Sequence, residues 1–446
     1  MTDQVATRTR PTERGASEAV DVVVVVGGGA IGLGIAWRAA LAGLRVVVVD
    51  DAPGQGASWA AAGMLAPVTE IHYGEQELLR LNLAAAERWP TFAAELQEYA
   101  GASVGYRRCG TLIVARDADD NAALDDLYRF QRGLGLHVER LRGRECRRLE
   151  PGLSPSIRGG IMAPGDHQVD NRALVAALLT ACDRAGVLRR SGRVVAGRVE
   201  HDRVRGVVLA GGETLDASTV VLAAGCWSGT LGGLPPGALP PVRPVKGQLL
   251  HLRGPAEQPL CQRNVRGLEV YVVPRDDGRV VVGATVEEQG FNTTVTAGAV
   301  HDLLRAALEL LPEVAELELV ETVAGLRPGS PDNAPLLGPS QLDGLVIAAG
   351  HYRNGILLTP VTADAVAELL VTGLVPEAIA AFSPRRFATL TVPDGAASWS
   401  PTVAQGGPAG AGALGGQAGA VEASLMEADV PPTATGFHGG ERGRPP

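Results

Sequence analysis

The sequence has few cysteines and no cysteine pattern typical of a metal site. Its 446 residues include five cysteines, which are widely spaced and form no CxxC pair. An odd, scattered set excludes a regular disulfide framework and favours free thiols in a reducing compartment without a structural metal. We therefore expect a cytoplasmic protein with no bound metal.

The chain also has no excess of positive charge and no long hydrophobic run. Its net charge of -9 argues against nonspecific binding to nucleic acid and against electrostatic docking on an anionic membrane. No apolar run reaches the roughly 20 residues that span a bilayer. The polar start lacks the long apolar core of a signal peptide. We expect neither a nucleic-acid partner nor a membrane association.

The two ends of the sequence have no hydrophobic periodicity. Residues 1–19 are polar, and residues 391–446 are dominated by Gly, Ala and Pro. Such segments bury too little apolar surface to offset the entropy lost on ordering. We predict that both ends are disordered and that the folded body lies between them.

Within that body, strand and helix signals alternate. Residues 21–26 are typical of a buried strand, residues 30–43 of a helix and residues 44–51 of a second strand. A strand, helix and strand within about thirty residues predict parallel pairing. The segments 246–254 and 268–286 instead carry alternating and hairpin patterns, which predict an antiparallel sheet. The predicted fold class is α/β, with a parallel-sheet dinucleotide domain interleaved with an antiparallel-sheet domain.

A glycine fingerprint connects the first strand to the first helix. Gly27, Gly29 and Gly32 form G-x-G-x-x-G, in which the glycines allow a tight turn, a close approach of pyrophosphate and close helix packing. The helix N-terminus favours phosphate. Asp50 ends the second strand, where a carboxylate binds ribose hydroxyls and disfavours NADP. These features predict a bound dinucleotide.

The fingerprint does not distinguish FAD from NAD. The segment 56–67, GASWAAAGMLAP, is built from small residues around Ser58. Small side chains there would let the backbone approach a large flat cofactor, but they also suit a tightly packed loop. Arg353 raises a similar question, because it lies in the apolar stretch AAGHYRNGILLTP. A buried cation is costly unless it is paired, so Arg353 is salt-bridged, exposed on a loop tip, or able to bind an anionic ligand.

Several motifs together resemble the D-amino-acid oxidase superfamily, and within it the glycine oxidases of thiamine biosynthesis. They are GGGAIG, GASWAAAGMLAP, STVVLAAGCWSG, PVKGQLL, YVVPR, VVGATVE, AGLRPGSPDNAPLLG and AAGHYRNGILLTP, in this order over about residues 20–388. The resemblance implies noncovalent FAD as the cofactor. It implies an FAD-binding domain in residues 20–100, 157–238 and 325–390 and a substrate domain in residues 101–156 and 239–324.

The resemblance also implies which residues hold the cofactor. They are Gly27, Gly29, Ala30, Ile31, Gly32, Asp50, Asp51, Ala57, Ser58, Ala62, Gly63, Met64, Val194, His351, Tyr352, Arg353, Asn354, Gly355, Ile356 and Leu357. The helix that begins near Ile356 would direct its positive end toward the reduced flavin.

In this superfamily, two arginines and a tyrosine hold the substrate. The matching positions are Arg327, Arg353 and Tyr271. An arginine fork suits a carboxylate. From the residues alone, Arg327 is also compatible with a surface position before Pro328. The chain departs from the glycine oxidase pattern at Glu269 and Val286, where such enzymes carry histidine and methionine, so its side-chain preference stays open.

The implied activity is oxidative deamination of glycine and of small amines such as sarcosine or small D-amino acids. Oxygen would be reduced to hydrogen peroxide, and the glycine imine would supply thiazole synthesis. Relatives form tetramers, which implies a homo-oligomer. Three alternatives stay open: an amino-acid dehydrogenase with another electron acceptor, a flavin-binding scaffold without turnover, and an NAD-dependent dehydrogenase.

Overall fold

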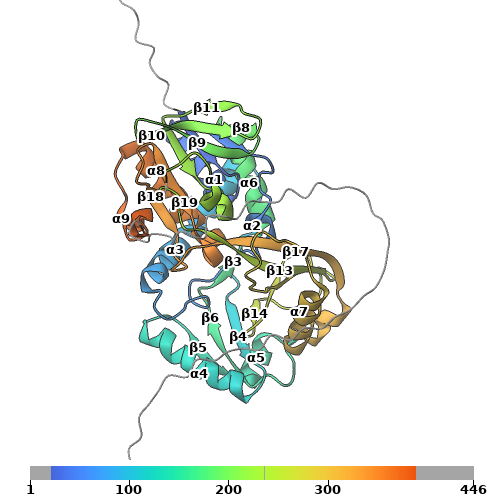
Figure 1. Cartoon of the computed structure of the whole chain (residues 1–446). Coiled ribbons are helices and arrows are strands. Elements are labelled where there is room, and N and C mark those ends of the chain that lie inside the picture. The colour runs from blue at the N-terminus through green and yellow to red at the C-terminus, as the bar shows by residue number, and fades with distance from the viewer. Residues whose placement is uncertain (1–21, 236, 388–446) are drawn as a thin grey trace, which may run out of the picture. The chain divides into compact units, whose positions relative to one another are not determined.

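A computed structural model describes residues 22–235 and 237–387. The predicted disordered segments 1–19 and 391–446 lie outside the described residues. Within the described residues, most strands belong to two large sheets and the helices pack on them (Figure 1). The predicted α/β fold class is confirmed.

The first sheet is the predicted parallel one. Within the described ranges it has six strands, and all neighbouring strands pair in parallel except at one edge, where β18 runs antiparallel to β19. In spatial order the strands are β18 (Leu336–Pro339), β19 (Leu345–Ala349), β12 (Thr219–Leu222), β1 (Val22–Val26), β2 (Arg45–Asp50) and β8 (Leu188–Ser191). The valine-rich strands at the centre are buried on both faces, as helix-covered parallel strands are.

The second sheet carries the predicted hairpins. Its eight strands, counted in the described residues, are β17 (Glu318–Gly329), β13 (Arg243–Arg253), β16 (Arg279–Gly283), β15 (Tyr271–Pro274), β14 (Asn264–Arg266), β4 (Thr111–Ala115), β6 (Gly159–Ala163) and β5 (Glu139–Arg142). One pair, β14 with β4, is parallel. A long stretch of chain, rather than a hairpin, separates these two strands. The sheet is therefore mixed rather than purely antiparallel.

Two small sheets complete the strands. One consists of β11 (Thr214–Asp216), β10 (Arg203–Leu209) and β9 (Val194–Glu200), and the other pairs β3 (Met64–Leu65) with β7 (His167–Gln168). The helices are α1 (Ala30–Leu41), α2 (Ala57–Ala60), α3 (Gln76–Ala100), α4 (Ala118–Gly133), α5 (Gly143–Leu149), α6 (Asn171–Arg184), α7 (Ala297–Leu310), α8 (Gly355–Thr372) and α9 (Glu377–Ala380). Short 3-10 helices are η1 (Gly225–Thr230), η2 (Pro312–Glu316), η3 (Tyr352–Asn354) and η4 (Pro384–Phe387).

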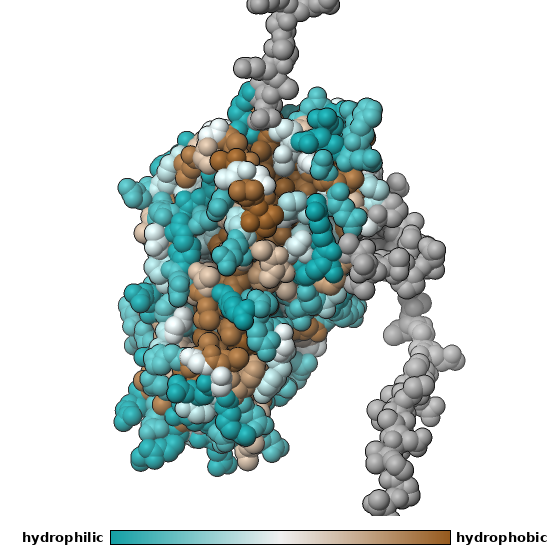
Figure 2. All heavy atoms as spheres, turned by 90° about the vertical axis from the view of Figure 1, so that its left-hand side faces the viewer, coloured by the Kyte–Doolittle hydropathy of each residue, from teal (hydrophilic) through white to brown (hydrophobic). Residues whose placement is uncertain are grey.

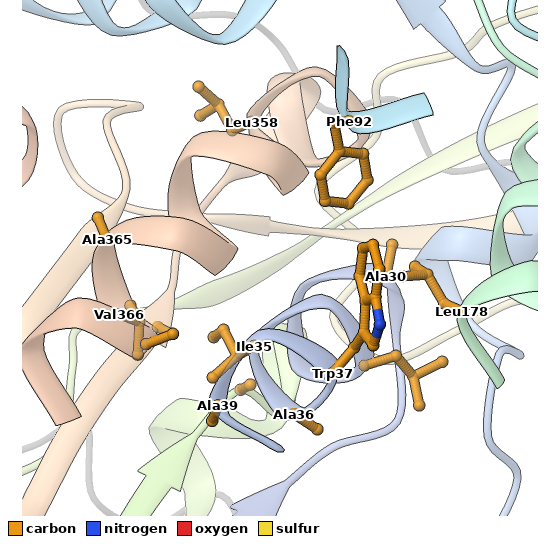
Figure 3. Packing of buried hydrophobic residues seen from close by; sticks show 14 of the residues in the cluster. Ala30, Ile35, Ala36, Trp37, Ala39, Phe92, Leu178, Leu358, Ala365 and Val366 are labelled. Atoms are coloured by element: carbon orange, nitrogen blue, oxygen red, sulfur yellow. The ribbon is translucent and has the colours of Figure 1, made fainter. Parts of the chain in front are cut away.

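The main hydrophobic core lies where α1, α3, α6 and α8 meet. Trp37 of α1 packs edge-on against Phe92 of α3, with ring centroids 5.6 Å apart. Leu178 of α6 and Leu358 of α8 belong to the same buried cluster (Figure 3). Because α1 and α8 pack together in this core, the positions of their N-terminal ends are fixed relative to each other.

Helix α8 is the one described helix that is long and apolar enough to cross a membrane, counted with η3. About 61% of its most apolar window is buried inside the protein, against α1 and α3. Its last turn leaves Val371 exposed. Figure 2 shows the face on the side of α8 and α9, where hydrophobic residues gather in patches. Packing in the core accounts for most of the apolar character of this helix.

All five cysteines are unpaired, and four of them are buried. Burial raises the pKa of Cys146 to about 11, and that of Cys182 and of Cys226 to about 12. Burial also raises the pKa of Cys109, the one half-buried cysteine. Each side chain is therefore a protonated thiol at neutral pH.

Candidate active site

The glycine fingerprint forms the turn between β1 and α1. Gly27 has a φ of 109°, which favours glycine, and its N–H donates to Val49 O at 3.0 Å. A Cβ on Gly32 would overlap the carbonyl oxygen of Gly27. The first turn of α1 therefore passes against the end of β1 with no room for a side chain, as the sequence predicts.

Asp50 and Ser58 converge on this turn from separate segments. Asp50 accepts hydrogen bonds from Gly28 N, at 2.6 Å, and from Ala52 N, at 2.7 Å. The Ser58 hydroxyl accepts from Ala30 N at 3.0 Å, next to Ile31 in the first turn of α1. Since the N-cap is Gly29, which has no side chain, Ser58 provides an oxygen at this helix end.

Val194 lies at the same edge of the parallel sheet. Gly192 N donates to Asp50 O at 3.3 Å, and Arg193 forms an ion pair with Asp51 at 3.0 Å. The start of β9, which contains Val194, is therefore next to the end of β2.

The segment 57–64 continues from α2 into β3, and several hydrogen bonds hold its backbone. Asn171 donates to Ser58 O at 2.8 Å, and the buried Arg275 donates to Ala62 O at 2.7 Å. Gly63 has a φ of 72°, and a Cβ there would overlap the oxygen of Val169. Ala57 and Met64 lie at the two ends of this segment. The segment is tightly packed, which is one of the two alternatives that its small residues suggested.

The segment His351–Leu357 links β19 to α8 through η3. His351 is buried and hydrogen-bonds through Nε2 to the Thr362 hydroxyl at 3.1 Å. Burial lowers the pKa of His351 to about 3, so the ring is neutral. Tyr352 has a left-handed φ of 47°, and α8 begins at Gly355, one residue before the predicted start. The segment also contains Arg353, Asn354, Ile356 and Leu357.

These features fit an extended dinucleotide. The turn after β1 lies at the carboxyl end of a parallel strand, where β2 and β12 flank β1 on opposite sides and the strand order switches. A Cβ on Gly27 would overlap the oxygen of Ala223, as one on Gly63 would overlap that of Val169, so the backbone at both turns is packed too closely for a side chain. The start of α1 would hold the pyrophosphate, Asp50 the ribose and the segment 57–64 the flavin side of FAD.

Two glycines on the second sheet make space for Arg327 and Tyr271. Tyr271 of β15 pairs with Gly283 of β16, and a Cβ on Gly283 would overlap the tyrosine ring. The Arg327 guanidinium lies against Gly247 of β13 in the same way. Burial raises the pKa of Tyr271 to about 12 against the opposing effect of the Arg327 charge, so the phenol stays protonated.

This face of the sheet meets the predicted flavin segment. A Cβ on Gly325 of β17 would overlap the methyl group of Ala60, so α2 lies directly against β17. Ala62 and Tyr271 belong to the same hydrophobic cluster. Strand β17 also contacts η3, which carries Arg353. The structure therefore brings Arg327, Tyr271 and Arg353 to the region of the segment 57–64.

Arg327 donates to two backbone carbonyl oxygens, Thr285 O at 3.0 Å and Lys246 O at 3.3 Å. Within the described residues, no carboxylate lies within ion-pair distance of its guanidinium. The surrounding backbone fixes the guanidinium and leaves its charge without a protein counter-ion, which is the state expected of a group that binds an anion.

Arg353 differs from Arg327, because protein carboxylates surround it. Its guanidinium lies 3.5 Å from Glu75 and 3.8 Å from Glu70, and it hydrogen-bonds to His72. Its side chain is 20% exposed, and its Nε and one terminal nitrogen are buried without a hydrogen-bond partner among the described residues. Of the three readings that the sequence left open, ion pairing is therefore present, and unused donors remain.

The sequence interpretation missed Arg266 and Glu70. Arg266 of β14 pairs directly with Tyr271 of β15, and its guanidinium donates to Thr69 O at 3.0 Å and to the Glu70 carboxylate. Gly267, between two apolar runs, was the available signal for a hairpin; in the structure Gly267 N donates to Val270 O, and the turn places Arg266 opposite Tyr271. No local pattern marks Glu70.

The two departures from the glycine oxidase pattern lie at the surface. Glu269 is 66% exposed and lies 3.7 Å from Arg116, and Val286 is 65% exposed. Neither side chain is buried with Tyr271 and Arg327.

A dinucleotide turn on a parallel sheet, together with a second sheet whose Arg327 has no carboxylate partner among the described residues, is typical of nucleotide-cofactor-dependent oxidoreductases. The chain belongs to the family DAO, FAD dependent oxidoreductase, whose model matches residues 22–369. The cofactor is FAD, and an NAD-dependent dehydrogenase is thereby excluded.

Individual relatives extend this result. The chain is 38% identical over 378 residues to the bifunctional protein ThiO/ThiG of Synechocystis sp., covering 83% of this chain and 55% of the relative. The crystal structure of glycine oxidase from Geobacillus kaustophilus matches with a TM-score of 0.75 and 36% identity, over 82% of this chain and 98% of that chain. Iminodiacetate oxidase from Chelativorans sp. matches with a TM-score of 0.73 and 30% identity, over 81% and 98% of the two chains. The chain thus spans about half the length of the bifunctional relative.

Proposed function

We propose that this chain is a glycine oxidase, which converts glycine, oxygen and water to glyoxylate, ammonia and hydrogen peroxide. The observation that carries the proposal is the half-buried guanidinium of Arg327, which has no carboxylate partner within the described residues and lies beside Tyr271. The likeness to glycine oxidase from Geobacillus kaustophilus supports glycine as the substrate. Sarcosine and small D-amino acids are secondary substrates in this proposal.

Each site residue has a role in the proposal. Arg327 binds the substrate carboxylate, and Arg353, whose guanidinium lies between Glu70 and Glu75, contributes a second positive charge to the site. Tyr271, which stays protonated, donates its hydroxyl hydrogen to the same carboxylate. Holding the carboxylate fixes the α-carbon, and this positioning lowers the entropic part of the barrier. When bound, FAD supplies the acceptor for the two electrons that leave the carbon–nitrogen unit.

The wider context belongs to the same proposal. The relative named ThiO/ThiG supports a role in supplying glycine imine for the thiazole of thiamine. We also retain the cytoplasmic location, the homo-oligomer and the division into FAD-binding and substrate domains. Two large sheets support that division, although β6, at Gly159–Ala163, joins the second sheet from within a predicted FAD-binding segment.

The test is the visible spectrum of the purified protein during anaerobic addition of glycine. Bleaching of the flavin, followed by recovery and peroxide release in air, is the expected result. Bleaching without oxygen consumption, but with reduction of a dye, would instead indicate a dehydrogenase with another acceptor. A flavin that no amine bleaches would indicate a scaffold and contradict the proposal.

A further inference from the structure

A row of alternating charges runs beside Tyr271. Glu70 lies between two guanidinium groups: it hydrogen-bonds to Arg266 and lies 3.8 Å from Arg353. Glu75 flanks Arg353 on its other side at 3.5 Å and accepts from Asn333 at 3.4 Å. The four charged side chains are each no more than 20% exposed, so solvent screens their interactions little.

The position of Glu70 is fixed by its neighbours. Thr69 donates to the buried Asp166 through its backbone N–H, at 2.8 Å, and through its hydroxyl, at 2.6 Å. Val68 N donates to the same carboxylate at 3.1 Å. Although burial acts to raise it, the charges of Arg266 and Arg353 hold the pKa of Glu70 below its usual range. Glu70 is therefore a fixed anion at neutral pH.

Glu70 has a different importance for its two partners. Arg353 retains Glu75 as a counter-ion if the charge of Glu70 is removed. Arg266 has no other carboxylate within ion-pair distance among the described residues, and its guanidinium otherwise donates to Thr69 O. Loss of the Glu70 charge would therefore free one specific cation, Arg266, directly across the strand pair from Tyr271.

We propose that Glu70 restricts this site to substrates with one carboxylate, and that Arg266 is a second carboxylate-binding group which Glu70 masks. The inference rests on the proposed function, in which Arg327 and Tyr271 bind the first carboxylate. The matching substrate class is the amino dicarboxylates, with iminodiacetate as the simplest probe. Its oxidation balances as iminodiacetate, oxygen and water giving glycine, glyoxylate and hydrogen peroxide.

The test compares Glu70→Gln with the matched control Glu77→Gln. Glu77 is 60% exposed and pairs with Arg80 at the start of α3, so its charge is lost away from the site. For each protein, kcat/KM is measured for iminodiacetate and for glycine. The measure is the ratio of kcat/KM for iminodiacetate to kcat/KM for glycine. We expect this ratio to rise about tenfold or more in Glu70→Gln, which is the effect of one gained charge-assisted contact, and to change less than about twofold in Glu77→Gln.

A double variant identifies the group that is freed. Adding Arg266→Gln to Glu70→Gln should return the ratio to within about threefold of the wild-type value, which is less than one charge-assisted contact. A ratio that does not rise in Glu70→Gln, or a gain that persists without Arg266, would overturn the inference. If Glu70→Gln does not fold or retain flavin, Arg266→Gln alone decides, because it leaves Glu70 to repel a second carboxylate. We then expect the ratio to fall, and an unchanged ratio overturns the inference.

Binding without turnover separates this inference from the proposed function. Calorimetric titration of wild type and Glu70→Gln with malonate and with acetate measures carboxylate binding alone. We expect Glu70→Gln to favour malonate over acetate about tenfold more than wild type does. Failure of glycine to bleach the wild-type flavin refutes the proposed function, whereas an unchanged preference for malonate refutes only the role of Glu70 and Arg266.

Discussion

Replacing Arg327 by alanine tests the centre of the proposed site. The guanidinium is held by Thr285 O and Lys246 O and has no carboxylate partner among the described residues. Its removal deletes a charge-assisted hydrogen bond to the substrate carboxylate, worth about 1.5–3 kcal/mol. At 1.36 kcal/mol per tenfold, kcat/KM for glycine should fall about 10- to 150-fold. Arg327→Lys keeps the positive charge but loses the guanidinium fork, so its kcat/KM for glycine should lie between those of Arg327→Ala and wild type.

The assay is the anaerobic rate of flavin bleaching at increasing glycine concentrations. The control is Arg253→Ala, at the exposed far end of β13, which should keep the wild-type rate and affinity. Loss of the donor to two carbonyl groups also predicts a lower melting temperature for Arg327→Ala than for Arg253→Ala. If Arg327→Ala retains FAD and its apparent glycine affinity matches that of the control, the carboxylate contact does not exist.

Three further predictions concern the cofactor turn, the buried carboxylate and the second arginine. Gly32→Ala should lose FAD, read as absorbance at the flavin band per protein, because its methyl group would overlap Gly27 O; Gly298→Ala, in open space, should retain it. Burial raises the pKa of Asp166 to about 6, so the folded protein favours the protonated carboxyl. The stability that this preference contributes is fully present below the ordinary pKa near 4 and is lost as the pH rises through 6. The free energy of unfolding, measured with urea at several pH values, should fall by up to roughly 3 kcal/mol over this range in wild type and should not fall in this way in Asp166→Asn. Parallel pH dependences of the two proteins would contradict this prediction. Arg353→Ala should raise KM for glycine more than about tenfold, and an unchanged KM would remove it from the proposed site.

The parts of the fold that follow from local sequence were predictable. The hydrophobic runs and turn glycines around Gly27 specify strand, turn and helix within one short segment, because each signal acts between near neighbours. The start of α8 and the hairpin at β15 and β16 follow from the same kind of signal. The role of Gly27 and Gly32 needed no knowledge of the remaining chain.

The charged surroundings of the site were not predictable in this way. Glu70 and Arg353 are far apart in sequence, and they meet only because α1, α3 and α8 pack together. Arg275 holds Ala62 O by a similar long-range contact. Such pairs leave no periodic trace, since the side chains of interacting partners depend on the tertiary fold rather than on neighbouring residues. The sequence left the state of Arg353 open for this reason.

The buried cysteines have a consequence for the durability of the protein. Peroxide attacks the thiolate form of cysteine, and the raised pKa of Cys146, Cys182 and Cys226 keeps these side chains protonated. Under the proposed function, hydrogen peroxide would form at every turnover and would meet these thiols in their less reactive, protonated form. The protein interior is thereby chemically suited to repeated catalysis, and inactivation should begin at the half-buried Cys109 rather than in the core.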